Sequence, residues 1–336
     1  MPLLEVKNLS VSFDTPRGEL QAVRDVSFSL DEGEILAIVG ESGCGKSVLC
    51  KSITRLLPDA ARIKSGSVVI DGVQVSSLPE RQVRKLRGRL FSMVFQDPMS
   101  ALNPSLTVSA QLSMAVRVHS PRMKRSEVRA RVLELLALAG LDRAGELCAV
   151  YPHNLSGGQR QRVVMAIALS SRPRILFADE PTTALDATLQ AQVLDLLREI
   201  RRDHGTATVL VSHDLGAVAR AADRVAVMYA GKIVETGTAE EVFYDPRHPY
   251  TWSLLLSLPS RARPGHELHT LPGVPPTIID PQPGDAFAPR NPWALEIDYE
   301  RQPPVFRVTD THFASTWLLD PRAPKMTSPV GGKSLA

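Results

Sequence analysis

The feature that most constrains the fold is a glycine-rich loop between an apolar run, residues 35–39, and a helix-like run, residues 48–57. The loop consists of Gly40, Glu41, Ser42, Gly43, Cys44, Gly45, Lys46 and Ser47. Strand, glycine loop, Lys-Ser pair and helix in this order are typical of a phosphate-binding loop. Its backbone N–H groups converge on phosphate, while the lysine reaches the β- and γ-phosphates and the serine hydroxyl ligates Mg²⁺. The sequence therefore predicts a nucleoside triphosphate and Mg²⁺ site at residues 40–47.

Composition excludes several other classes of protein. The chain has 336 residues, of which 43% are hydrophobic and 22% charged, and its net charge is +3. This charge is too small to favour a nucleic-acid partner. No run approaches the about eighteen apolar residues of a membrane-spanning helix, and residues 3–13 begin a strand without a charged-then-apolar leader. We expect a cytosolic chain that binds no nucleic acid and reaches a membrane only through a partner.

Three cysteines occur, and they form neither a C-x-x-C pair nor a zinc-binding spacing. This usage fits a reducing compartment. Cys50 and Cys148 lie in helix-like, partly apolar surroundings, which favours a packing role for both. Cys44 lies inside the phosphate loop, where backbone N–H groups and Lys46 are expected to favour the thiolate.

The pattern of strands and helices changes along the chain. Residues 3–95 alternate strands and turns around the phosphate loop, with 19–30 as an antiparallel strand, and residues 175–235 return to strand and helix alternation. The segment 106–171 has no strand pattern. Its run 127–139 places Val128, Val132, Leu135, Leu136 and Ala139 on one helix face. We expect an α/β core with a mostly parallel sheet, interrupted by a helical subdomain at about 99–171.

Further motifs follow the phosphate loop in a fixed order. Leu155, Ser156, Gly157, Gly158 and Gln159 precede a helix-like run, and an apolar strand at 175–178 ends in Asp179 and Glu180. Asp186 ends the segment 184–186, His213 follows the strand-like residues 207–212, and Gln96 follows the strand-like residues 91–95. These segments resemble the signature, Walker B, D-loop, switch-histidine and Q-loop motifs of ABC transporter ATPases. The resemblance covers residues 3–260, and it implies a P-loop ABC ATPase core with an antiparallel β-subdomain.

The resemblance also implies roles for these residues in ATP hydrolysis. Asp179 would hold Mg²⁺ through water, together with Ser47 and Gln96. Glu180 would orient and deprotonate the attacking water, and His213 and Gln96 would complete the γ-phosphate environment.

Two implied roles concern the rest of the nucleotide. The signature residues 155–159 would contact the ATP that is held by a facing subunit, because each ATP in this family lies between two ATPase domains. Phe13, at the end of the first strand, would stack on the adenine. A core position for this phenylalanine is the alternative.

The C-terminal part of the chain narrows the subfamily. Prolines and glycines crowd residues 259–292, so we expect an ABC ATPase domain at 1–258 and an irregular, loop-rich extension at 259–336 without a core of its own. The segments 96–104, 248–252 and 271–276 resemble those of the ATP-binding subunits of oligopeptide, dipeptide and nickel importers. This resemblance implies ATP hydrolysis coupled to solute import.

The extension departs from that subfamily at one point. Such extensions often carry four cysteines that hold an iron–sulfur cluster. In this chain the corresponding positions hold Asp285, Asn291, Asp298 and Thr316. Oxygen ligands do not replace thiolates around such a cluster, so we predict that none is bound.

The resemblance implies several partners. They are a second ABC ATPase subunit that is a paralogue, two transmembrane permease subunits and an extracytoplasmic solute-binding protein. With these partners, the chain is expected to lie peripherally on the cytoplasmic face of the inner membrane. Two alternatives remain, an ABC exporter ATPase and a soluble non-transport ABC ATPase, although the latter normally has two cassettes or a coiled-coil insertion. The cargo is open between peptide, nickel, opine and glycoside.

Overall fold

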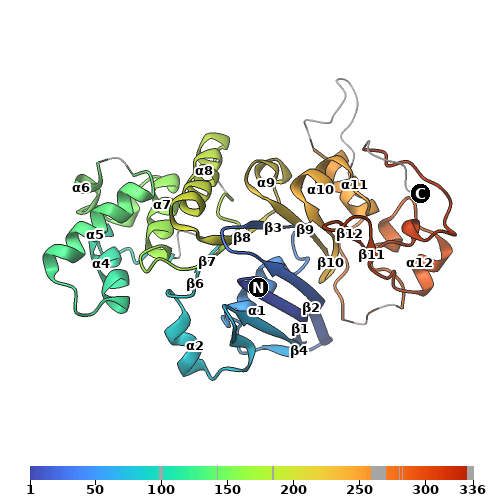
Figure 1. Cartoon of the computed structure of the whole chain (residues 1–336), viewed down its shortest axis with the longest axis horizontal. Helices are drawn as coiled ribbons and strands as arrows, with labels where there is room; N and C mark the ends of the chain where they lie inside the picture. The colour runs from blue at the N-terminus through green and yellow to red at the C-terminus, as the bar shows by residue number, and fades with distance from the viewer. Residues whose placement is uncertain are drawn as a thin grey trace. The chain divides into compact units, whose positions relative to one another are not determined.

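The computed structural model describes residues 1–97, 101–141, 143–183, 185–258, 270–279, 281 and 283–330 (Figure 1). Residues 98–100, 184 and 259–269, which belong to segments quoted above, lie outside this described part. The chain divides into two compact units, which are described separately. Unit 1 comprises residues 1–4, 30–35 and 70–211, and unit 2 comprises residues 5–29, 36–69 and 212–336.

The sheet of unit 2 that carries the phosphate loop begins with strand β3 (Ile35–Val39). This strand pairs in parallel with β9 (Arg224–Tyr229), which pairs antiparallel with β10 (Lys232–Thr238). All five residues of β3 are buried, as is typical of a parallel strand that is covered on both faces. The short strands β12 (Phe313–Ala314) and β11 (Phe306–Arg307) continue this sheet antiparallel beyond β10 (Figure 1).

A second sheet in unit 2 contains β2 (Gly18–Leu30), β1 (Leu4–Thr15) and β4 (Ala61–Ile70), with β1 in the middle. Helix α1 (Lys46–Ile53) follows the phosphate loop directly. It begins two residues earlier than the helix-like run at 48–57 and ends before Leu57. The reason for the early end is Arg55, whose φ of 57° is left-handed and incompatible with a continuing helix.

Unit 2 contains several further helices. They are α9 (Leu215–Ala221), α10 (Ala239–Tyr244), α11 (Pro249–Leu256), α12 (Glu296–Glu300) and the 3₁₀ turns η4 (Ala288–Arg290) and η5 (Trp317–Leu319). The C-terminal extension shares the core of this unit, because Phe287 and Ile278 join the cluster that contains Val227 and Tyr250. The sequence pattern did not predict that β12 would add to the sheet, since a two-residue strand has no readable period.

Unit 1 contains the parallel strands β6 (Phe91–Val94), β7 (Ile175–Asp179) and β8 (Ala207–Ser212), with β7 in the middle. Phe91 is in register with Ile175, and Ile175 with Ala207. The amphipathic helix α8 (Ala187–His204) connects β7 to β8, in the segment 175–235 where the sequence predicts alternating strands and helices. The unit also contains β5 (Val73–Gln74), η1 (Val75–Ser77) and α2 (Glu80–Leu86).

The described residues between 106 and 171 contain no strand, as the sequence pattern predicts. They form α4 (Val108–His119), α5 (Arg125–Leu138), α6 (Ala144–Leu147), η2 (Pro152–Asn154) and α7 (Gly157–Ala168) (Figure 1). The predicted apolar face of α5 is confirmed, because the residues that α5 buries are Val128, Val132, Leu135 and Leu136. Burial of this face against α4 and α7 holds the three helices together.

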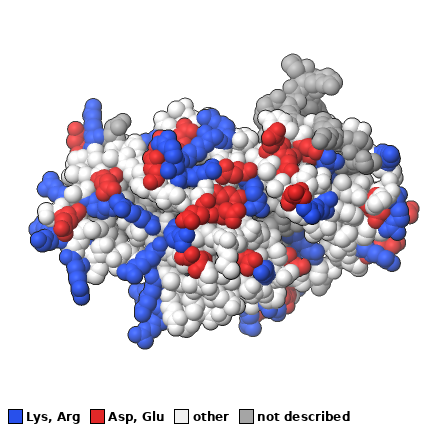
Figure 2. Space-filling model, viewed as in Figure 1, with Lys and Arg blue, Asp and Glu red and all other residues white. Residues whose placement is uncertain are grey.

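Basic side chains cover the solvent-exposed face of α2, and a basic side chain pairs with an acidic one on α5. In α2, Arg81, Arg84 and Lys85 are exposed, whereas Val83 is buried. Arg131 of α5 forms an ion pair with Glu134, one turn away. Basic and acidic side chains lie beside one another on the face of the molecule that Figure 2 shows.

Candidate nucleotide site

The phosphate loop leaves the end of β3 in a conformation that requires glycine at two positions. Gly40 has a φ of 152°, and a Cβ atom there would lie 2.1 Å from the carbonyl oxygen of Met228 on β9. Gly45 has a φ of 105°, and its Cβ would lie 2.2 Å from the carbonyl oxygen of Ala22 on β2. Any side chain would displace the backbone at either position. These glycines therefore fix the path that turns the chain from β3 into α1.

Lys46 is the cation of this loop. It is the first residue of α1 and is only 4% exposed. Its Nζ donates hydrogen bonds to the carbonyl oxygens of Gly40, at 2.8 Å, and of Glu41, at 2.9 Å. The positive end of the α1 dipole adds to this charge, and the N-cap Gly45 has no side chain to satisfy the first amides of the helix. The loop thus presents a lysine and a helix N-terminus, which suits a phosphate group.

The expectation that Cys44 favours its thiolate is wrong. Burial raises the pKa of the Cys44 thiol, and this outweighs the opposite effect of the Lys46 charge. The side chain is 2% exposed, and its Sγ lies 3.8 Å from Lys46 Nζ. Cys44 packs under the loop as a small neutral side chain. Cys50 is also fully buried, which agrees with its expected packing role, whereas Cys148 is half-buried.

Two further predicted residues lie in unit 2. His213 is exposed and directly follows β8. The next residue, Asp214, fixes the turn into α9, because its Oδ1 accepts from the backbone N–H groups of Gly216 and Ala217 at 2.9 and 3.1 Å. Phe13 lies on β1 and is half-buried, so part of its ring is accessible to a ligand.

The acidic pair lies in unit 1, where β7 ends. Asp179 is the last residue of the strand and is 2% exposed. Glu180 has a φ of 49°, a left-handed conformation that costs a non-glycine residue about 1–2 kcal/mol. Its backbone N–H donates to the carbonyl oxygen of Val211 on β8 at 3.0 Å, which holds this conformation. Local backbone strain of this kind is concentrated at functional sites.

The structure brings the predicted Q-loop glutamine to this pair. Gln96 Nε2 donates to Glu180 Oε2 at 3.1 Å, and Thr183 Oγ1 donates to the same oxygen at 2.8 Å. Two neutral donors, Gln96 and Thr183, therefore orient the Glu180 carboxylate. A carboxylate that is oriented in this way can accept a proton from an attacking water.

The signature residues form the start of α7. Ser156 is the N-cap, and its Oγ accepts from the Gln159 backbone N–H at 3.2 Å, while Gln159 Oε1 accepts from the Ser156 N–H at 2.9 Å. Leu155 is buried and Gly157 exposed. A cavity of about 480 Å³ opens at this helix start, lined by Ser156, Gly158, Gln159 and residues that include Arg162 and Gln192.

The signature and the D-loop residue come together through α8. Asp186 is the N-cap of α8, and its Oδ1 accepts from the Leu189 backbone N–H at 2.9 Å. A Cβ on Gly158 would lie 2.8 Å from the Leu189 side chain, so the glycine permits close contact between α7 and α8. Within unit 1 the structure thus gathers Gln96 with Glu180, and the signature with the start of α8. Within unit 2 it gathers residues 40–47.

Sequence reasoning missed the residues that surround Glu41. The Glu41 carboxylate forms a two-fold ion pair with Arg290 of η4, and its backbone N–H donates to Tyr250 Oη at 2.8 Å. Tyr229 Oη also lies 3.2 Å from Arg290 Nη1. In the sequence, the segment 248–252 indicates only the resemblance to importer subunits. No sequence signal pointed to Arg290.

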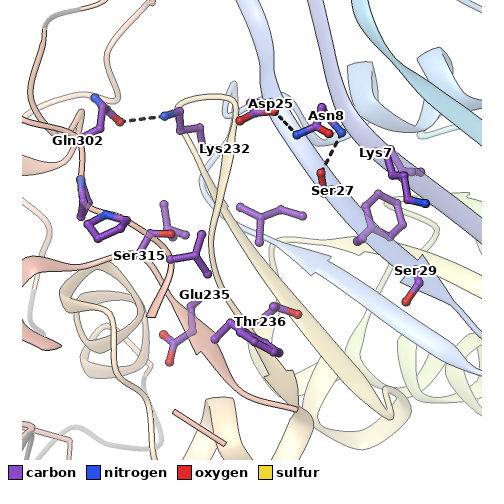
Figure 3. Close-up of a pocket in the computed structure, with 18 of the residues that line it drawn as sticks. Lys7, Asn8, Asp25, Ser27, Ser29, Lys232, Glu235, Thr236, Gln302 and Ser315 are labelled. Carbon is purple, nitrogen blue, oxygen red and sulfur yellow. Dashed lines mark hydrogen bonds between the residues drawn. The ribbon is translucent and has the colours of Figure 1, made fainter. Parts of the chain in front are cut away.

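Unit 2 also contains a cavity of about 660 Å³ between β1, β2, β10 and the C-terminal extension (Figure 3). Lys232 Nζ donates to Gln302 Oε1 at 2.9 Å on one side, and Asn8 Nδ2 donates to Asp25 Oδ1 at 2.8 Å on the other. Burial lowers the pKa of Lys232. None of the lining residues belongs to the phosphate loop, so this cavity is distinct from the nucleotide site.

Comparison with known proteins places these motifs in a family. The family model described as "ABC transporter" matches residues 23–183, and the model "Oligopeptide/dipeptide transporter, C-terminal region" matches residues 234–297. The oligopeptide transport ATP-binding protein OppD of Bacillus subtilis is 48% identical over 334 residues, which cover 99% of this chain and 93% of that protein. The dipeptide transport ATP-binding protein DppD of Lactococcus lactis is 49% identical over 325 residues, 97% of this chain and 93% of that protein.

A solved structure agrees with this placement. The dimeric ATP-binding cassette MJ0796, in a post-hydrolysis state bound to ADP and Pi, matches with a TM-score of 0.64 and 29% sequence identity. The match covers 70% of this chain and 98% of that one. The α/β fold with its P-loop ATPase core is therefore confirmed. With both family models matched and nearly full-length relatives at almost half identity, this chain belongs to the ABC transporter ATP-binding proteins of the oligopeptide and dipeptide transport family.

Proposed function

We propose that this chain hydrolyses ATP to power the import of peptides through an ABC transporter. One observation carries the proposal. A phosphate loop with a buried lysine, Lys46, and a strand that ends in Asp179 and an oriented Glu180 occur in a chain that is 48% identical to an oligopeptide transport ATP-binding protein. The match of residues 234–297 to the C-terminal region of oligopeptide and dipeptide transporters favours import over an exporter ATPase.

One group of residues would bind the phosphates, and another would carry out hydrolysis. The backbone N–H groups of residues 40–47 and the Lys46 ammonium hold the phosphates. Glu180, aimed by Gln96 and Thr183, orients the attacking water and accepts its proton. Phosphoryl transfer requires positioning and charge neutralisation rather than covalent catalysis, so no covalent intermediate with the protein is needed. His213 adds a donor for the γ-phosphate, and Phe13 offers its accessible ring to the adenine.

The chemistry of three side chains suits a magnesium ion. Mg²⁺ prefers oxygen ligands, and the Ser47 hydroxyl, the Asp179 carboxylate and the Gln96 side-chain oxygen are of this kind. When bound, the ion would neutralise charge on the β- and γ-phosphates.

The single phosphate loop and single signature of this chain imply a facing ATPase domain. Ser156 and the first amides of α7 lie at a helix N-terminus, which suits the γ-phosphate of an ATP held by the other subunit. The complete assembly would contain a second, paralogous ATPase subunit, two permease subunits and an extracytoplasmic solute-binding protein. Closure of the two ATPase domains around ATP, and their opening after hydrolysis, would drive the permeases.

The membrane connection would run through the permeases. Across the described residues, no helix is both long and apolar enough to cross a membrane. We place the chain on the cytoplasmic face of the inner membrane as a peripheral subunit.

Reconstitution of the transporter in liposomes tests which solute it imports. The chain, its partner ATPase and the permeases encoded beside it are assembled in liposomes with the associated solute-binding protein. Di- and oligopeptides are expected to stimulate ATP hydrolysis and to accumulate in an ATP-dependent manner, and nickel and a glycoside serve as comparison solutes. If nickel or the glycoside stimulated ATP hydrolysis and accumulated in the liposomes, and no peptide did so, peptide import would be refuted. The ATPase role would stay intact.

The extension does not fit an iron–sulfur cluster. Each residue at the four cluster positions uses a side-chain oxygen to accept from a nearby backbone N–H. The pairs are Asp285 with Phe287 at 3.2 Å, Asn291 with Trp293 at 3.0 Å, Asp298 with Leu295 at 2.7 Å and Thr316 with Leu318 at 3.3 Å. Burial raises the pKa of Asp285 to about 6. These oxygens stabilise turns of the extension and offer no thiolate to iron.

We therefore predict that protein prepared without oxygen contains no stoichiometric iron or acid-labile sulfide. Colorimetric iron and sulfide assays, with the visible absorption spectrum, measure this directly. A variant with cysteine at all four positions (D285C, N291C, D298C and T316C) is the matched control and is expected to gain the absorption of a cluster after reconstitution with iron and sulfide. Equimolar cluster iron and sulfide in the natural chain would refute the prediction.

A further inference from the structure

Two side chains from distant parts of unit 2, Arg290 and Tyr250, contact Glu41, the second residue of the phosphate loop, and Tyr229 contacts Arg290. We call this group, Arg290, Tyr250 and Tyr229, the Glu41 brace. Arg290 Nη1 donates to Glu41 Oε2 at 2.7 Å, and Nη2 donates to Oε1 at 2.9 Å. The Arg290 side chain is 7% exposed and that of Glu41 24%. This two-fold geometry in a mostly buried setting is stronger than a surface ion pair.

Arg290 is held in place on every side of its guanidinium. Its Nε donates to the carbonyl oxygen of Pro272 at 2.7 Å, and Nη1 also donates to Tyr229 Oη at 3.2 Å. The guanidinium carbon lies 5.8 Å from the centre of the Tyr229 ring. Tyr229 is on β9 and Pro272 is in the extension, so these contacts hold the guanidinium in the position where it pairs with the Glu41 carboxylate.

Tyr250 holds the backbone of the same residue. Its Oη accepts from the Glu41 N–H at 2.8 Å, and burial keeps the phenol neutral by raising its pKa above the ordinary value. The start of α11 is fixed in turn, because the Tyr250 N–H donates to His248 Nδ1 at 3.0 Å. The carbonyl oxygen of Glu41 accepts from Lys46 Nζ at 2.9 Å. All three hydrogen-bonding parts of Glu41 are therefore engaged.

The charge of Glu41 explains why a brace is needed. A carboxylate within the phosphate loop lies beside the site where a highly charged anion binds, and like charges in a partly buried setting repel strongly. A two-fold pair with a guanidinium cancels this charge and fixes the side chain.

We propose that Arg290 is a positioning residue for the phosphate loop: through the Glu41 brace, the C-terminal extension sets the affinity of the chain for ATP. The proposal rests on the nucleotide site proposed at residues 40–47. It assigns to the extension a part in ATP binding. Arg290 acts through Glu41, so its loss affects binding more than the chemical step.

The test measures ATP affinity and steady-state kinetics of the full chain in its assembled transporter. Arg290→Ala is expected to raise the Kd and KM for ATP about tenfold or more, with a much smaller change in kcat, because removing one partner leaves a partly buried carboxylate unpaired beside the phosphates. Arg290→Lys is expected to restore part of the affinity, since an ammonium keeps the charge but not the two-fold geometry. The double variant E41Q/R290A is expected to bind ATP more tightly than Arg290→Ala, because no unpaired charge remains.

Arg322→Ala is the matched control. Arg322 lies in the same extension, pairs with Asp320 and is 83% exposed, so its removal is expected to leave Kd and KM unchanged. The melting temperature of each variant is measured in parallel. If Arg290→Ala lowers the melting temperature but leaves Kd and KM unchanged, Arg290 only stabilises the fold and the proposal is wrong.

Two further outcomes separate this inference from the proposed function. If E41Q/R290A binds ATP no better than Arg290→Ala, charge cancellation at Glu41 is not the mechanism, and the proposal is overturned. If the natural chain itself fails to bind ATP, the nucleotide site proposed at residues 40–47 is wrong, and the inference falls with it.

Discussion

Glu180→Gln is expected to lower the ATPase turnover of the assembled transporter by about 10²- to 10³-fold or more, and to leave the affinity for ATP nearly unchanged. The substitution keeps the size of the side chain but removes the carboxylate that we propose accepts the proton of the attacking water. Thr183 can still donate to the amide oxygen that replaces Oε2, so the geometry at the end of β7 is retained. The groups proposed to hold the nucleotide, Lys46 and the loop amides, are not changed by the substitution.

Steady-state phosphate release and equilibrium nucleotide binding measure the two effects separately. Glu199→Gln is the matched control, because Glu199 is exposed on α8 of the same unit. This substitution is expected to leave turnover and ATP affinity unchanged. Turnover of Glu180→Gln near that of the natural chain would remove Glu180 from the catalytic role.

Lys46→Ala is expected to weaken ATP binding about 30-fold or more. Truncating one partner of a buried, hydrogen-bonded charge pair costs about 2–5 kcal/mol, and each 1.4 kcal/mol corresponds to a factor of ten. Lys46 is 4% exposed and lies at the start of α1, so no other side chain of the loop can supply its charge. The Nζ also donates to the Gly40 and Glu41 carbonyl oxygens, so its loss loosens the loop itself.

Titration with a fluorescent ATP analogue measures this affinity, and a melting curve confirms that the variant is folded. Lys51→Ala provides the comparison, because Lys51 is in the last turn of the same helix, away from the loop. The role of Lys46 would be contradicted if Lys46→Ala bound ATP within a few-fold of Lys51→Ala.

The sequence alone determined the features that depend on consecutive residues. The phosphate loop is eight adjacent residues between an apolar run and a helix, and its glycines act through their own backbone dihedral angles. The spacing of apolar residues predicted the buried face of α5, since a helix repeats every 3.6 residues wherever it is placed. The order of the motifs then identified the family, which the relatives confirmed.

The local sequence pattern was less informative in two situations. In one, a single residue ended a helix, and in the other, burial decided the pKa of a side chain. Helix α1 stops at Ile53 because Arg55 is left-handed, and no apolar period signals that change. The pKa of Cys44 was predicted in the wrong direction because the sequence showed the neighbouring Lys46 but not the burial of the thiol. Desolvation depends on how many atoms from elsewhere in the chain surround a group.

Only the tertiary structure revealed the Glu41 brace. Glu41 and Arg290 are 249 residues apart, and each reads in the sequence as one charged residue among many. They meet because β9, α11 and the extension pack into one core, with Phe287 inserted beside Tyr229 and Tyr250. The energy of an ion pair depends on distance and burial, and neither quantity is encoded by residue type or spacing. The sequence therefore determined the phosphate-loop motif and its glycine-dependent backbone, and the fold decided which residues contact Glu41 within that loop.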